Sequence, residues 1–308
     1  MIDIHCHYWK RAYLPETFWR AQASFFVKWF EGKKTNKTLT QIEEEVFSQY
    51  WDSDGGGTLK AMDKAGIETA LLLPIDFGFT LGEAAVPIEV QNQEVAKIAM
   101  AHRDRFIPFI GVDPRRKGAI DLLRRGIEEW GAQGLKYHGI GEFFPTEEKG
   151  LPLLELAEKN RLIFLVHQGP LMHPFESKYC HPKDLGPVLK MFPKLRVVAA
   201  HLAFSWWRDL IEVAQQAPSL YADISGWQLV ALENPSQFSH ILRKVMDGIG
   251  GNRILFGTDG PTFDPFLSKK AYVDFFQYLV ERQETPRFST DEVRRLLEGN
   301  AHHLLGDG

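Results

Sequence analysis

Cysteine is scarce in this chain, and Cys6 and Cys180 are the only two among 308 residues. Two cysteines cannot build the disulfide framework of a small secreted domain, so we expect a protein of the reducing cytoplasm. Long apolar runs are absent as well, and none reaches the roughly 20 residues that a membrane-spanning helix needs. The N-terminus has no basic stretch followed by an apolar one. We therefore expect neither a secretory signal nor a membrane partner.

A large excess of charge of either sign is also lacking, since the formal net charge is -4 at pH 7. This balance argues against a nucleic-acid partner and points to a small-molecule substrate. No Gly-x-Gly-x-x-Gly turn follows the first apolar run, which weakens the case for a doubly wound sheet that binds dinucleotides. Hydrophobic residues make up 44% of the chain and charged residues 25%, as is typical of a soluble globular enzyme.

Eight short apolar runs alternate with stretches whose apolar residues have helical spacing. The runs are residues 1–7, 67–73, 106–112, 134–138, 163–167, 197–201, 220–223 and 254–259, and the last helical stretch is 275–305. Short, continuously apolar strands that alternate with helices indicate a parallel sheet covered on its outer face. Eight such units predict an α/β fold of the (β/α)8 TIM-barrel type. We expect a single domain over residues 1–308, with an insertion at about 8–57.

The predicted insertion is rich in aromatic residues and partly helical in spacing, for example at Trp19, Phe26 and Phe30. It carries twelve aromatic residues, more than a solvated loop would hold. These side chains are expected to be buried against the barrel mouth, a ligand or another subunit. The segment is therefore predicted to be either a lid over the site or a homodimer contact, with the glycine run 55–57 as a hinge.

Polar side chains with metal-binding chemistry end several of the runs. His5 and His7 lie two residues apart, so on a strand they share one face and form a chelating pair. The other members are Lys136 and His138 in the fourth run, His167 in the fifth, His201 in the sixth and Asp259 in the eighth. The carboxyl ends of barrel strands meet at the face where barrel enzymes place their chemistry. Three imidazoles and a carboxylate at that face suit a divalent transition metal such as zinc, with one position open to water.

Each of these residues has another explanation when it is taken singly. His167 could be a hydrogen-bonded core histidine, and Asp259 a turn residue before Gly260. Lys136 could be a surface lysine at a frayed strand end, and His138 could lie in a solvated loop rather than face the site. Their shared position at one face of one barrel favours a common site.

Several stretches along nearly the whole chain match a known family. They are Asp3-Ile4-His5-Cys6-His7, Met62-Asp63-Lys64-Ala65-Gly66-Ile67, Phe106-Ile107-Pro108-Phe109, Gly134-Leu135-Lys136-Tyr137-His138, His167, Ala200-His201, Gly257-Thr258-Asp259 and Gly299-Asn300-Ala301. Together they resemble the amidohydrolase superfamily, in the branch that contains aminocarboxymuconate-semialdehyde decarboxylase and related metal-dependent hydrolases and decarboxylases. The aromatic segment after His7 lies outside this resemblance.

The resemblance implies roles for the residues at these positions. The implied metal ligands are His5, His7, His167 and Asp259. His201 would act in catalysis beside the metal without having to be a ligand. In two-metal members, a lysine at the position of Lys136 carries a carbamate that bridges the ions, and His167 and His201 would bind the second ion. In one-metal members Lys136 would instead pair with an anionic substrate. By analogy we expect one zinc ion.

The expected activity is hydrolysis of an amide, ester or lactone-like bond in a small carboxylated substrate, through a metal-activated water. Asp259 can accept a proton from that water, and His201 is a candidate proton carrier. The alternative is non-oxidative decarboxylation of an unsaturated or aromatic carboxylic acid, which needs nearly the same residues. A non-catalytic metal-binding barrel is a third, less favoured hypothesis, because no ligand position has been substituted.

Overall fold

Eight parallel strands form the centre of the computed structural model, which describes residues 1–281 and 286–306. They are β1 (Ile2–Cys6), β2 (Thr69–Leu72), β3 (Phe106–Gly111), β4 (Gly134–Tyr137), β5 (Ile163–Val166), β6 (Arg196–Ala199), β7 (Leu220–Asp223) and β8 (Ile254–Leu255). Each strand is hydrogen-bonded to the next in chain order. The ring closes where the amide of Asp259 donates to the His5 carbonyl at 2.7 Å and the amide of His7 donates to the Gly260 carbonyl at 2.6 Å. The predicted (β/α)8 barrel is thereby confirmed, and every strand overlaps a predicted run.

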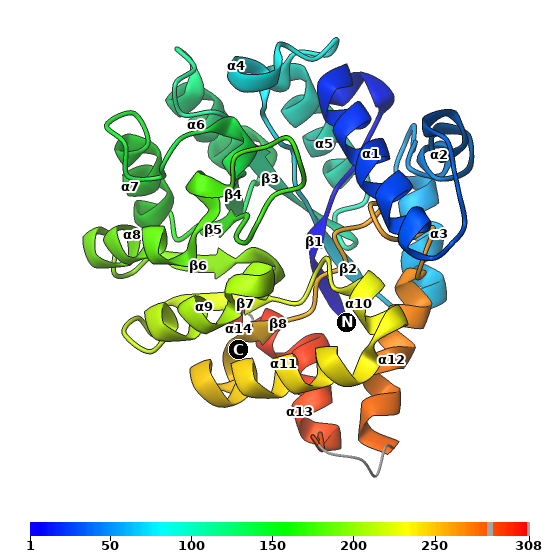
Figure 1. Ribbon diagram of the computed structural model, residues 1–308. Helices are drawn as coiled ribbons and strands as arrows, with labels where there is room; N and C mark the ends of the chain where they lie inside the picture. The colour runs from blue at the N-terminus through cyan, green and yellow to red at the C-terminus, as the bar shows by residue number, and fades with distance from the viewer. Residues whose placement is uncertain (282–285, 307–308) are drawn as a thin grey trace.

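Helices surround the strands and fill the connections between them (Figure 1). The α-helices are α1 (Glu16–Gly32), α2 (Leu39–Glu45), α3 (Gly56–Ala65), α4 (Gly78–Leu81), α5 (Ile88–Ala101), α6 (Ala119–Trp130), α7 (Leu151–Lys159), α8 (Leu185–Met191), α9 (Trp207–Ala214), α10 (Gln228–Glu233), α11 (Pro235–Ile249), α12 (Lys269–Glu281), α13 (Thr290–Arg294) and α14 (Asn300–Leu305). The other helical segments are η1 (Arg11–Tyr13), η2 (Phe47–Gln49), η3 (Gly139–Gly141), η4 (Ser177–Cys180), η5 (Pro182–Asp184), the irregular η6 (Ala200–Trp206), η7 (Gly251–Arg253) and the π-helical η8 (Arg295–Gly299). Among the described residues, no helix is both long and apolar enough to cross a bilayer.

The predicted C-terminal helical stretch, 275–305, is divided in the structure. Helix α12 begins earlier than predicted, at Lys269, and α13, η8 and α14 follow as shorter pieces. Residues 282–285 of that stretch lie outside the described residues.

Alternate residues of the strands pack on the two sides of the barrel wall, as the period of two along a strand requires. On β5, Ile163 and Leu165 belong to the interior cluster, whereas Phe164 and Val166 belong to the layer between strands and helices. Burial on both faces explains why these runs are continuously apolar.

The segment between β1 and β2 lies over one side of the barrel mouth, where α1 and α2 appear in dark blue (Figure 1). Its aromatic side chains form a cluster with Ile75, Phe77 and Phe263 from loops that follow barrel strands. Trp19 and Phe26 are both 0% exposed within the single chain. Their burial therefore requires no second subunit.

The glycine run at 55–57 leads into a capped helix start, and its role as a hinge stays a prediction. Gly56 and Gly57 are the first residues of α3. The Asp52 carboxylate accepts hydrogen bonds from the amides of Gly55 (3.0 Å) and Thr58 (2.8 Å) and from the Thr58 hydroxyl (2.8 Å). Capping of this kind satisfies helix-start amides that would otherwise lack partners, and so it stabilises one conformation.

Candidate metal centre

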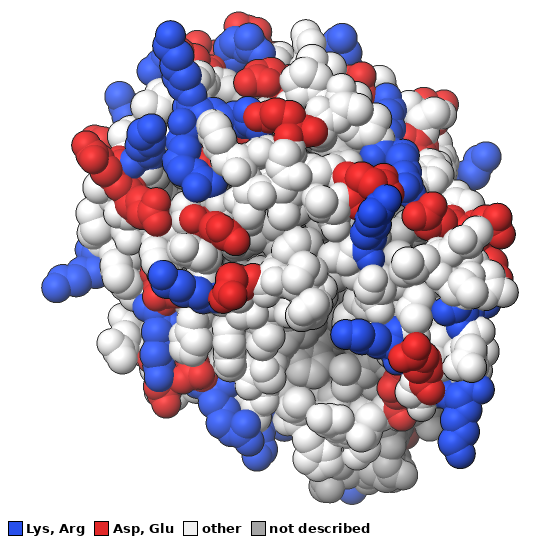
Figure 2. All heavy atoms as spheres, turned by 45° about the horizontal axis from the view of Figure 1, so that its top comes forward, with Lys and Arg blue, Asp and Glu red and all other residues white. Residues whose placement is uncertain are grey.

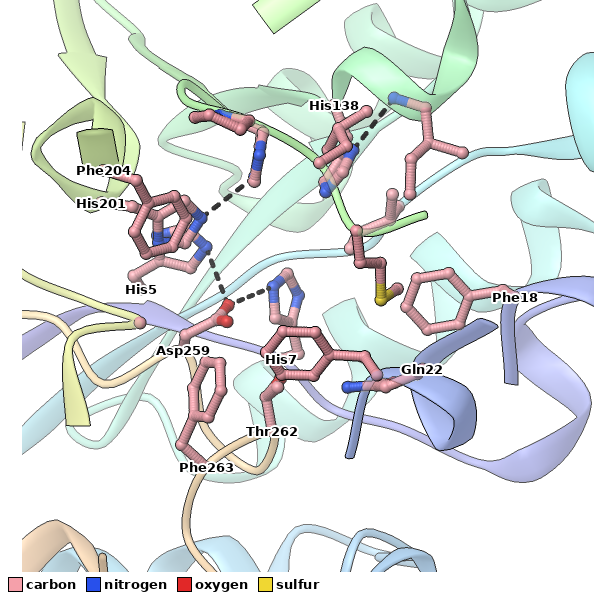
Figure 3. A pocket seen from close by; sticks show the side chains of 18 of the residues that line it. His5, His7, Phe18, Gln22, His138, His201, Phe204, Asp259, Thr262 and Phe263 are labelled. Atoms are coloured by element: carbon pink, nitrogen blue, oxygen red, sulfur yellow. Dashed lines mark hydrogen bonds and ion pairs between the residues drawn. The ribbon is translucent and has the colours of Figure 1, made fainter. Parts of the chain in front are cut away.

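Three predicted ligands meet at the mouth of the barrel (Figure 3). The Asp259 Oδ1 atom lies 3.4 Å from the His5 Nε2 atom and 3.2 Å from the His7 Nε2 atom. One donor atom from each of the three residues lies within 4.8 Å of the others. His5 lies on β1, His7 directly follows that strand, and Asp259 follows β8, so barrel closure between the first and last strands brings them together.

The far side of each imidazole is already engaged by the protein. His7 Nδ1 donates to the Leu73 carbonyl at 2.7 Å, and His5 Nδ1 donates to Asp223 Oδ2 at 2.9 Å. Because each Nδ1 carries the proton, each Nε2 presents a lone pair toward Asp259. Two imidazole nitrogens and a carboxylate oxygen converging in this way fit a divalent cation.

Asp223 is a site residue that the sequence analysis missed. It ends β7 and is fully buried. Its Oδ1 atom accepts hydrogen bonds from the amides of His201 and Ser225, both at 3.0 Å, while Oδ2 holds His5. His5, His201 and Asp223 also form a compact donor set, but here Asp223 is occupied by N–H groups and orients the rings. The sequence offered one signal for Asp223, because it is a carboxylate at the end of the seventh apolar run.

His201 and His167 lie beside this centre and face each other. The His201 Nε2 and His167 Nδ1 atoms are 3.0 Å apart. His201 Nδ1 lies 2.8 Å from the Ser225 hydroxyl. Neither compact donor set found among the described residues includes His167. The structure thus brings His5, His7 and Asp259 together and places His167 in contact with His201 instead.

A strained backbone holds His201 in position. Residues His201 to Phe204 all have positive φ angles, between 46° and 61°, which is costly for side chains with a Cβ atom. The Phe204 ring stacks on the His201 ring with centroids 4.8 Å apart. Gly226 permits this arrangement, since a Cβ atom there would lie 2.8 Å from the Phe204 ring and 3.0 Å from His201 Nδ1.

Lys136 and His138 both face the same region. Lys136 is buried, and its Nζ atom lies 3.1 Å from His5 Nε2. His138 lines the pocket and stacks on His167 with ring centroids 4.2 Å apart. Of the two arrangements considered for His138, the structure shows the one that faces the site.

Burial sets the protonation of these groups. It lowers the pKa of Lys136 to about 8 and lowers the pKa values of His5, His138, His167 and His201 below the usual value of 6.5. The histidines are therefore neutral near pH 7, as metal ligation requires. Burial opposes ionisation of Asp259, but the neighbouring imidazoles of His7, His5 and His201 outweigh this effect and lower its pKa.

The centre opens into a cavity of about 340 Å³. Its walls are mainly apolar and aromatic, and its titratable groups gather around the candidate ligands (Figure 3). The lining residues are His5, His7, Trp9, Phe18, Gln22, Phe25, Phe26, Ile75, His138, Ile140, His167, Pro170, Leu171, Met172, His201, Phe204, Gly226, Leu229, Val230, Asp259, Thr262 and Phe263. Within the described part of the chain, this lining contains no lysine or arginine. Charges of both signs are instead interspersed on the outer surface (Figure 2).

The fold is similar to several solved structures, each less than 25% identical in sequence. An uncharacterized TIM-barrel protein from Bordetella bronchiseptica is 22% identical, with a TM-score of 0.68 over 99% of this chain and 98% of that chain. A dihydroxybenzoic acid decarboxylase from a Polaromonas species, with bound manganese and the inhibitor 2-nitroresorcinol, is 18% identical (TM-score 0.65, 99% and 96% covered). The 5-carboxyvanillate decarboxylase of Sphingomonas paucimobilis is 15% identical (TM-score 0.64, 99% and 98% covered).

The sequence itself was compared with curated proteins and with family models. No curated protein matches it. The family model described as Amidohydrolase matches residues 2–306, which is nearly the whole chain. The chain therefore belongs to this amidohydrolase family and is a metal-dependent enzyme.

Proposed function

We propose that this protein is a non-oxidative decarboxylase of an aromatic or otherwise unsaturated carboxylic acid. The observation that carries the proposal is the pocket, whose mainly apolar and aromatic walls lead to the polar group of His5, His7 and Asp259. A planar apolar body fits between such walls, and its carboxyl group would face His7 and Asp259. Two proteins of similar fold support this reading, since by name they decarboxylate dihydroxybenzoic acid and 5-carboxyvanillate.

We infer that His5, His7 and Asp259 hold one divalent cation. When bound, the cation supplies Lewis-acid polarisation of a substrate oxygen and neutralises part of its charge. Zinc remains our first choice because two imidazoles and a carboxylate are a common zinc donor set, although a protein of similar fold contains manganese. His167 remains a proposed fourth ligand: its Nδ1 atom contacts His201, and its buried Nε2 atom has no hydrogen-bond partner among the described residues.

Decarboxylation replaces a carboxyl group by hydrogen. The ring carbon gains a proton, its bond to the carboxyl carbon breaks, the bonding electron pair returns to the ring and carbon dioxide leaves. Asp259 is ionised at rest because its pKa is lowered, so it would take up that proton from solvent and then pass it to the ring carbon. It is the best placed carrier, because its side chain is 15% exposed while those of His5 and His7 are 1% and 3% exposed.

Other residues would prepare the substrate for this step. His201 and His167 share a proton along their 3.0 Å contact, so one of them donates and the other accepts. This pair can hydrogen-bond a substrate oxygen at the pocket wall. The apolar walls keep water from the carboxylate, and loss of hydration raises the energy of its concentrated charge more than that of the dispersed charge in the transition state.

Hydrolysis of an amide, ester or lactone-like bond is the second candidate function. The position of Asp259 beside two imidazoles favours it, because a carboxylate there can also accept a proton from an attacking water. Lys136 lies next to His5 and is not itself part of the pocket lining. We propose that it lies near the anionic group of the substrate in either reaction.

A product assay separates the two reactions. The metal-loaded protein would be incubated with a panel of benzoic, hydroxybenzoic and naphthoic acids and, separately, with aryl esters and lactones in ¹⁸O-labelled water. We expect carbon dioxide release from at least one acid and no labelled oxygen in the ester or lactone products. Incorporation of ¹⁸O into the products without release of carbon dioxide would contradict the decarboxylase proposal and support the hydrolase proposal.

A further inference from the structure

Gln22 is an unusual residue on the buried face of α1. Six residues of the helix are buried, namely Phe18, Trp19, Ala21, Gln22, Ala23 and Phe26, and of these Phe18, Gln22 and Phe26 line the pocket. Gln22 is the one polar member of this set, and it stands four residues from both Phe18 and Phe26. A leucine or methionine would continue the apolar stripe, so packing alone does not explain a glutamine here.

The amide oxygen of Gln22 is buried without a partner. The side chain is 3% exposed, and its Oε1 atom has no hydrogen bond within the described part of the chain. A buried amide that lacks hydrogen bonds destabilises the folded protein. Gln22 also lines the cavity, and Figure 3 shows its amide end pointing from α1 toward the middle of the pocket. An unpaired group in this position is ready to pair with a ligand.

The helix presents this amide from a fixed position. The Trp19 Nε1 atom donates to the Arg11 carbonyl at 3.0 Å, and Phe26 packs on Phe266 with ring centroids 4.7 Å apart. These contacts anchor α1 on both sides of Gln22. The amide is therefore preorganised, which reduces the entropy lost when a ligand binds.

We propose that Gln22 is a specificity-determining residue that binds a hydroxyl group on the side of the substrate facing α1. A hydroxyl group both donates and accepts, so it can satisfy either end of the amide. A second carboxylate is disfavoured, because the lining offers no lysine or arginine to neutralise it. The proposal deepens the proposed function and rests on it for the presence of the carboxyl group at the metal centre.

Binding measurements on matched ligand pairs test this role without requiring turnover. Calorimetric Kd values would be measured with the metal-loaded protein for benzoate against 3- and 4-hydroxybenzoate, for 2-naphthoate against 6-hydroxy-2-naphthoate, and for toluene against p-cresol. The variants are Gln22→Leu and the more nearly isosteric Gln22→Met. Gln277→Leu is the matched control, since Gln277 is exposed on α12.

In the parent protein and the control, we expect the hydroxylated member of at least one pair to bind at least about five-fold more tightly. Both Gln22 variants should lose that preference while binding the parent ligands as well as before. Their melting temperatures should be equal to or above that of the parent protein, because an unpaired buried amide has been removed.

The outcomes separate this proposal from the proposed function. The proposal for Gln22 is wrong if acids bind but the hydroxylated member of no pair binds more tightly. It is also wrong if the preference for the hydroxylated ligand survives in both Gln22 variants. If only the cresol pair is discriminated and no acid binds, the role of Gln22 stands and the decarboxylase proposal fails. If nothing binds, both proposals are wrong.

Discussion

His5 and His7 depend on hydrogen bonds at the far side of each ring for their orientation. Leu73 supplies a backbone carbonyl to His7, which no side-chain substitution can remove, whereas Asp223 supplies a carboxylate to His5. A carboxylate that accepts a hydrogen bond from the outer nitrogen of a ligating histidine fixes the tautomer of that ring and raises its basicity. The metal affinity of this centre therefore depends on Asp223, a residue that need not touch the metal.

Replacing Asp223 by asparagine tests that dependence. The amide keeps the shape but can direct an N–H group at His5 Nδ1, which would move the imidazole proton to Nε2 and block ligation. We expect the metal affinity to fall about 10- to 100-fold, measured by competition with a chromogenic chelator. Asp121→Asn, at a highly exposed position on α6, is the matched control. Unchanged affinity in the Asp223 variant would show that His5 is oriented by other contacts.

In either proposed reaction, Asp259 is the residue that we expect to transfer the proton. Asparagine at this position retains an oxygen ligand but loses the ability to take up and release a proton. At saturating metal, we expect kcat to fall by about 10² to 10⁴, the usual contribution of a positioned acid or base. Metal content measured on the same samples separates loss of chemistry from loss of the ion. A variant that turns over within a few-fold of the parent protein would refute this role.

The residues of the site differ in how well they could be predicted from the sequence. His5 and His7 stand out because their spacing has a direct geometric meaning on a strand, and Asp259 because it ends an apolar run. Asp223 ends a run as well, but nothing in the sequence shows that it points at an imidazole. Gln22 could not be predicted, because a glutamine in an amphipathic helix is expected on the polar face until the packing is known.

At the scale of secondary structure, the strands were predictable and the placement of α1 was not. A strand buried on both faces has to be continuously apolar, so its position follows from composition alone. The position of α1 depends on tertiary contacts such as the hydrogen bond from the Tyr50 hydroxyl to the Thr262 carbonyl at 2.7 Å. This bond ties the segment between β1 and β2 to the loop that carries Asp259.

Two neighbouring phenylalanines on α1 allow its packing to be tested. Phe26 is fully buried beside Phe266, whereas Phe25 is 38% exposed. We expect Phe26→Ala to lower the free energy of unfolding by about 3–5 kcal/mol in a denaturant titration, because it leaves a cavity in the aromatic cluster. Phe25→Ala should cost much less. Equal losses from the two variants would mean that α1 is not packed on the barrel as described.

At the scale of the whole molecule, the barrel gathers several neutral histidines in one buried place. His5, His138, His167 and His201 come from β1 and from the ends of β4, β5 and β6, and burial lowers the pKa of each. In the unfolded chain the same side chains titrate near a pKa of about 6.5. The folded and unfolded states therefore bind different numbers of protons in mild acid.

The sign of the resulting pH dependence follows from this difference. Below about pH 6.5 the unfolded chain takes up protons that the folded chain does not, so the free energy of unfolding falls as the pH falls, by up to about 1.4 kcal/mol per pH unit for each such histidine. Denaturant titrations of the metal-free protein at pH 7.5, 6.5 and 5.5 should show this loss. His138→Gln, which removes one of the four groups, should make the slope shallower. If stability stayed constant from pH 7.5 to 5.5, the histidines would have to be accessible to protons in the folded state, and the neutral, metal-ready cluster described here would not exist.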